Sequence, residues 1–144
     1  MDNATIERLE SSFKLLAPRG DDLVDQFYSR LFAENPSVRP MFPESMADQK
    51  KMLLASLVLV VKNLRNPEKL AESLKKLGGR HEGYGTKAEH YPIVRDVLVY
   101  VMAEMAGNQW NDQLTEDWTN ALDFVASIML EGQKEVQNGS RQAA

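Results

Sequence analysis

Apolar side chains recur every three or four residues along most of the chain, which is the spacing of one face of an α-helix. The stretches with this pattern cover residues 3–16, 21–32, 46–64, 66–81, 93–105 and 115–136. Proline or glycine stands near most of the boundaries between them, where a helix is interrupted and the chain turns. The run 52–61 is rich in β-branched residues but lacks the period-two alternation of a strand. We therefore expect an all-α fold of six to eight helices of unequal length, without an up-and-down bundle topology.

The size and charge of the chain limit what it can be. Its 144 residues and hydrophobic content of 43% fit one compact domain, whose core is large enough to enclose a small cofactor. We place this domain at residues 1–136 and expect the polar residues 137–144 to form a disordered tail. The net charge of −4 gives no basic surface for nucleic acid. The longest apolar run, 52–61, is too short to span a membrane.

The chain contains no cysteine, which excludes disulfides, thiolate metal sites and cysteine catalysis. Residues 1–8 are polar and do not resemble a signal peptide. Both features suit a reducing cytoplasm, where we expect the protein to act. Nothing in the sequence resembles the nucleophile, base and orienting residue of a conventional hydrolase.

One histidine is the candidate metal ligand. His81 follows three leucines at spacings that put all four side chains on one stripe of a helix. The leucines are Leu70, Leu74 and Leu77. Glycines at positions 79, 83 and 85 indicate that the helix ends here and that the backbone turns. A neutral imidazole on an apolar wall is a candidate axial ligand for a haem iron, and a cap of the helix C-terminus is the structural alternative.

Three further side chains stand out in the first half of the chain. Tyr28 lies on the apolar stripe of the second predicted helix, where its hydroxyl needs a partner. Phe42 stands in a proline-rich corner, where it would either fill a small core or pack flat against a planar ligand. Gln49 shares one helical face with Leu53 and Leu57, and an amide on such a face has to be satisfied. A tyrosine bonded to a carbonyl and a glutamine at the solvated rim are the alternatives that these patterns leave open.

The order and spacing of these residues resemble a bacterial single-domain globin and are similar to the haem domain of flavohaemoglobins. The resemblance rests on the motif DQFYSRLFAENP, the phenylalanine at position 42, the motif DQKKML and the motif GGRHEGYGTKAEHY. It covers residues 5–136 in the family's order. The resemblance implies a globin fold with haem b, iron protoporphyrin IX, in its pocket.

Within this resemblance, His81 matches the proximal ligand of the haem iron and Phe42 matches the aromatic residue that packs on the haem face. Tyr28 and Gln49 match the distal pair that forms hydrogen bonds to the gas ligand. A buried phenol and a buried amide can each donate such a bond. A glutamine in the distal position argues against a haem held by two histidines, and we expect the other histidine, His90, to be exposed.

Tyr91 and Glu135 match the residues that orient the proximal histidine, and a phenol and a carboxylate there would raise its donor strength. The residues implied to act in catalysis are Tyr28, Gln49, Tyr91 and Glu135. The residues implied to contact haem are Phe42, Gln49, Leu53, Leu77, His81, Tyr84, Tyr91 and Val94.

The resemblance implies high-affinity, reversible binding of dioxygen at a five-coordinate iron, together with binding of nitric oxide and carbon monoxide. Flavohaemoglobins continue into flavin and nicotinamide domains, whereas this sequence ends at residue 144, so nitric oxide dioxygenase activity would need a separate reductase. A haem-based gas sensor or interaction module that signals to a partner protein is the alternative. A helical protein that has lost haem is a third reading, against which the four matching positions argue.

Overall fold

The computed structural model describes residues 1–83 and 86–143, which form helices and no strand. The α-helices of this part of the chain are α1 (Asn3–Leu16), α2 (Gly20–Glu34), α3 (Ala47–Lys62), α4 (Pro67–Gly83), α5 (His90–Ala106) and α6 (Asp112–Ala143). Short 3-10 helices follow three of them, namely η1 (Ala17–Arg19), η2 (Pro36–Met41) and η3 (Gly107–Gln109). The all-α prediction is confirmed. Among the residues described, no helix is both long and apolar enough to cross a membrane.

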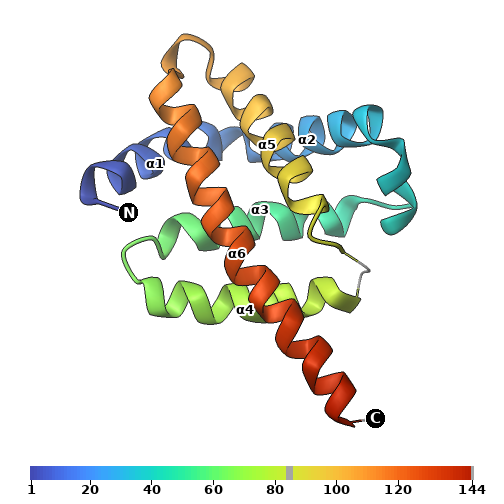
Figure 1. The fold of residues 1–144 in the computed structure, drawn as a ribbon. Coiled ribbons are helices and arrows are strands. Elements are labelled where there is room, and N and C mark those ends of the chain that lie inside the picture. Colours follow the sequence, from blue (N-terminus) through green and yellow to red (C-terminus); the bar gives the residue numbers. More distant parts are fainter. Residues whose placement is uncertain (84–85, 144) are drawn as a thin grey trace.

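The long helix α6 organises the fold. It crosses the molecule diagonally and packs most extensively against α4, with further contacts to α5 and α1 (Figure 1). On the other side, α2 packs against α5 and α3. In Figure 1, α6 crosses α3 and α4 at a steep angle, whereas the axis of α5 has nearly the same direction as that of α6, and these two helices pack together. The arrangement is not an up-and-down bundle, as expected.

The N-terminal helix α1 is fixed to α6 by a buried indole and an ion pair. Trp118 is 1% exposed, and its Nε1 donates to the hydroxyl of Ser12 at 2.9 Å. Arg8 donates to both carboxylate oxygens of Asp117, at 2.6 and 3.1 Å, and this bond lowers the pKa of the Asp117 carboxyl. These contacts set the rotation of α6 about its axis, and therefore which of its residues face α4 and α5.

The crossing of α4 and α6 depends on two glycines. A Cβ added at Gly78 would lie 2.0 Å from the carbonyl oxygen of Met129. One added at Gly132 would lie 2.1 Å from the carbonyl oxygen of Lys75. The two backbones therefore leave no room for a side chain at either position. The helix end predicted among Gly79, Gly83 and Gly85 agrees with the structure, in which α4 ends at Gly83.

The last helix begins earlier than the apolar pattern indicates. It starts at Asp112 and not at Thr115, because Asn111 caps it: the side-chain oxygen of Asn111 accepts from the backbone N–H of Leu114 at 2.9 Å. The helix runs on to Ala143 without a break at residue 136, where the sequence placed the end of the domain.

Candidate functional site

His81 lies in the last turn of α4 and is half-buried. Its ring Nδ1 lies 2.8 Å from the carbonyl oxygen of Leu77. Because a carbonyl can only accept, Nδ1 carries the proton, and the lone pair of the neutral ring is on Nε2. Burial is the main cause that lowers the pKa of His81, so the ring is neutral near pH 7. This protonation state and tautomer are those of a histidine that binds a metal.

Tyr28 and Gln49 come together as the sequence predicts. Tyr28, on α2, is 4% exposed, and the side-chain amide of Gln49, on α3, donates to its hydroxyl oxygen at 3.2 Å. Burial raises the pKa of Tyr28, which keeps the phenol protonated. Since Gln49 is the donor in this bond, the phenol hydrogen can point to another acceptor.

Phe42 packs edge-on against Tyr28. Its ring centroid lies 5.7 Å from that of Tyr28 and 5.3 Å from that of Phe32. The proline-rich corner around it is held by Arg39, whose guanidinium donates to the carbonyls of Phe42 and Pro43 at 3.3 and 3.0 Å. These carbonyls have no helical partners, so the arginine supplies the hydrogen bonds that fix the corner.

The apolar residues predicted to contact haem keep part of their surface uncovered. Leu53, Leu77 and Val94 are half-buried and pack against the edge of the core. Each is therefore partly accessible at the edge of the core. Tyr84, the remaining residue of this predicted set, lies outside the described residues.

On the side of the histidine, Tyr91 and a glutamine form a hydrogen-bonded group. The ring centroid of Tyr91, on α5, lies 6.4 Å from that of His81. The Tyr91 hydroxyl donates to Oε1 of Gln133, and Nε2 of Gln133 donates to the carbonyl oxygen of Thr86 at 2.8 Å. Gln133 is 3% exposed, and the sequence interpretation missed it. Its position four residues after Met129, on the apolar stripe of α6, is the signal that could have found it.

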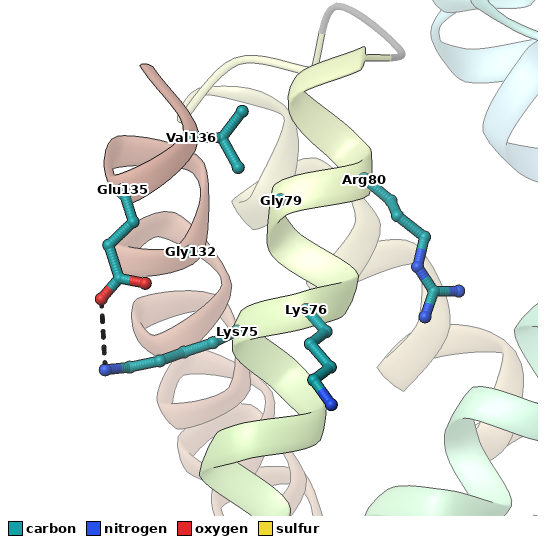
Figure 2. Close-up of a pocket in the computed structure, with 7 residues that line it drawn as sticks. All are labelled: Lys75, Lys76, Gly79, Arg80, Gly132, Glu135 and Val136. Carbon is teal, nitrogen blue, oxygen red and sulfur yellow. Dashed lines mark hydrogen bonds and ion pairs between the residues drawn. The ribbon is translucent and has the colours of Figure 1, made fainter. Parts of the chain in front are cut away.

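The structure does not bring Glu135 to the histidine. Glu135 follows Gln133 by two positions, or about 200° of helix rotation, so it faces away from Tyr91. Its side chain is 64% exposed and pairs with Lys75 at 3.4 Å. Figure 2 shows this pair beside the crossing of α4 and α6, in a hollow that Gly79 also lines. The prediction that Glu135 orients His81 therefore has no support in this geometry.

Known proteins resemble this chain over most of its length. The chain is 28% identical over 140 residues to a flavohemoprotein of Xylella fastidiosa strain Temecula1. The aligned region covers 94% of this chain and 34% of that protein. The chain thus spans about a third of the length of the curated relatives it matches.

Two solved structures have the same fold over nearly their whole length. A bacterial globin from Campylobacter jejuni matches with a TM-score of 0.85 and 25% identity, covering 95% of this chain and 99% of that one. An engineered carbene transferase from Rhodothermus marinus, provisionally described as a nitric oxide dioxygenase, matches with a TM-score of 0.88 and 23% identity, covering 98% and 99%. The globin family model matches residues 25–129. Because that match spans most of the chain, the protein belongs to the globin family.

Proposed function

We propose that this globin binds haem b, with His81 as the axial ligand of the iron. The observation that carries the proposal is the bond between His81 Nδ1 and the Leu77 carbonyl, because it selects the neutral tautomer with its lone pair on Nε2. The other residues fit the same group: Phe42 offers a flat ring, and Tyr28 and Gln49 offer polar hydrogens. The half-buried apolar residues around them offer surface that a porphyrin would cover.

When bound, haem supplies an iron centre that takes up dioxygen, carbon monoxide or nitric oxide. The residues of this chain then decide how firmly the gas is held. Tyr28 keeps its proton because of burial, and Gln49 already donates to the phenol oxygen, so the phenol hydrogen is available to the gas ligand. A polarised dioxygen ligand is stabilised by such donors in a pocket that excludes water. We therefore propose high-affinity dioxygen binding at a five-coordinate iron, and the buried phenol and its amide neighbour support the affinity part of this proposal.

A nitric oxide dioxygenase activity is the reaction we propose for this site. One nitric oxide, one dioxygen and one electron combine to give nitrate. The likeness to flavohemoproteins and to the Rhodothermus protein supports the proposal. A reductase would have to supply the electron.

The direct test of haem binding is the absorption spectrum of the purified protein after addition of haemin. We expect a strong Soret band that shifts on reduction with dithionite and shifts again on addition of carbon monoxide. The second shift reports an iron position that is open to gas ligands. A protein that gives no Soret band after reconstitution would contradict the proposed function.

Replacing Tyr28 with phenylalanine is expected to speed dioxygen release by about 10-fold, because the loss of one hydrogen bond in a pocket of low dielectric costs about 1–3 kcal/mol. Stopped-flow displacement of dioxygen by carbon monoxide measures the rate. Tyr100→Phe is the matched control, because Tyr100 is 44% exposed and its hydroxyl bonds Glu104 on the surface. An unchanged rate in Tyr28→Phe would show that the phenol does not bond the ligand.

A further inference from the structure

Two neighbouring contacts join α2 to the start of α3. The side-chain amide of Gln49 donates to the Tyr28 hydroxyl at 3.2 Å. One residue further along α3, Nζ of Lys50 lies 2.9 Å from Oδ1 of Asp25. Asp25 precedes Tyr28 by three positions, or about one turn of α2, so the ion pair lies next to the hydrogen bond. The ion pair joins two different helices and can therefore fix the spacing that the hydrogen bond requires.

The first half of α3 has few other anchors. All of α3 lies in the described part of the chain, and its buried side chains, Leu57 and Val60, both belong to its second half. Met46 stands at the N-cap position, where its thioether makes no capping hydrogen bond. A helix end without buried apolar side chains or a cap opens locally at low free energy. Polar contacts with α2 therefore have a larger share in holding this end of α3 in place.

Beside the ion pair, α2 and α3 are not closely packed. A hollow of about 650 Å³ lies between the two helices, lined by the pair and by apolar side chains that include Val24 and Leu54. Space that side chains do not fill leaves α3 room to shift relative to α2. Nearer the start of α2 the contact is tight, since a Cβ added at Gly20 would lie 2.8 Å from Cδ2 of Leu54. The ion pair lies between this tight contact and the hydrogen bond at the start of α3.

We propose that Lys50 and Asp25 are positioning residues, whose ion pair holds the start of α3 against α2 so that Gln49 stays bonded to Tyr28. The phenol hydrogen then stays directed to the gas ligand. This inference rests on the proposed function, because it concerns how firmly the gas is held.

The exposure of the pair limits the size of the effect. The side chains of Lys50 and Asp25 are 33% and 58% exposed, so water and salt weaken their attraction. Exposed pairs change an equilibrium by up to about 5-fold. The ion pair therefore adjusts the rate of gas release, and its loss has a smaller effect than loss of the phenol.

Exchanging the two charges tests the pair. Lys50→Asp or Asp25→Lys alone places two like charges opposite each other, and we expect dioxygen release to become about 3–5-fold faster. Stopped-flow displacement by carbon monoxide measures this rate. The double variant Asp25→Lys/Lys50→Asp restores opposite charges and should return to the rate of the unmodified protein. An acidic residue near a helix N-terminus favours the helix, so Lys50→Asp does not weaken α3 by itself.

Hydrogen–deuterium exchange of the protein without haem reports the same contact independently of gas binding. The backbone amides of residues 47–56 should exchange about 3–5-fold faster in each single variant and at the original rate in the double variant. Exchange in the other helices should not change, which distinguishes local opening of α3 from a general loss of stability.

Lys51→Asp is the matched control, because it makes the same change of charge one position away, at an exposed residue. It should leave the release rate and the exchange rate close to those of the unmodified protein. If Lys50→Asp does not differ from this control, or if the double variant behaves like the single ones, the inference is overturned and the proposed function stands. A protein that takes up no haem would overturn the proposed function, while the exchange measurement would still decide whether the pair holds α3.

Discussion

Replacing His81 with alanine abolishes the Soret band of the reconstituted protein or weakens haem binding by about 100-fold or more. This effect exceeds the 10–100-fold losses that follow from removal of a residue that only supports a metal ligand. The reason is that His81 combines a half-buried position, a lowered pKa and a proton held on Nδ1 by Leu77. Titration with haemin, followed by the ferrous and carbon monoxide spectra, measures the loss.

His90→Ala is the matched control for this experiment, because the chain has two histidines. His90 is half-buried and not exposed as expected, and its ring accepts a hydrogen bond from the backbone N–H of Lys87 at the start of α5, which is a local contact. Its removal should leave the haem spectrum unchanged. A protein that keeps the full ferrous spectrum without His81 would contradict the axial assignment.

The placement of Tyr28 and Gln49 on core-facing helix stripes could be predicted from sequence because it depends on local spacing. Gln49 and Leu53 share a face by helical spacing alone, and Tyr28 lies on an unbroken apolar stripe. These patterns alone left the partners of both side chains open, and the family resemblance implied that the phenol and the amide belong together, as the hydrogen bond in the structure shows. The neighbouring proline corner carries Phe42, whose place follows from the backbone constraint of proline.

The part around the histidine could not be predicted in the same way, because it depends on the rotation of α6. A shift of two residues turns a helical side chain to nearly the opposite face, which separates buried Gln133 from exposed Glu135. That rotation is set by contacts with α1, more than 100 positions away in the chain: the bond from Trp118 to Ser12 is one of them. The spacing of apolar residues within α6 does not reveal that α1 is its partner or how the two helices are rotated against each other.

Replacing Gly78 with alanine is expected to destabilise the fold by about 2–3 kcal/mol, the upper part of the range for overpacking. The added methyl group would lie 2.0 Å from the carbonyl oxygen of Met129, and a backbone carbonyl cannot rotate away as a side chain can. Urea unfolding followed by circular dichroism measures the effect on the protein without haem. Gly139→Ala is the control, since nothing lies within 4 Å of its added Cβ. The free energy of unfolding of that variant should rise by about 0.5–1 kcal/mol, because alanine has a higher helix propensity than glycine.

Gly78→Ala also tests whether the packing of α4 against α6 affects haem binding. In Gly78→Ala, α4 and α6 must move apart, and His81 moves with α4 while Gln133 moves with α6. We therefore expect faster transfer of haem to an excess of a scavenging apoglobin in addition to the loss of stability, although the substituted residue contacts no ligand. If Gly78→Ala unfolds at the same urea concentration as the unmodified protein, the close approach of the two backbones is not what holds α4 in place. The histidine would then have to be positioned by its hydrogen-bonded neighbours alone.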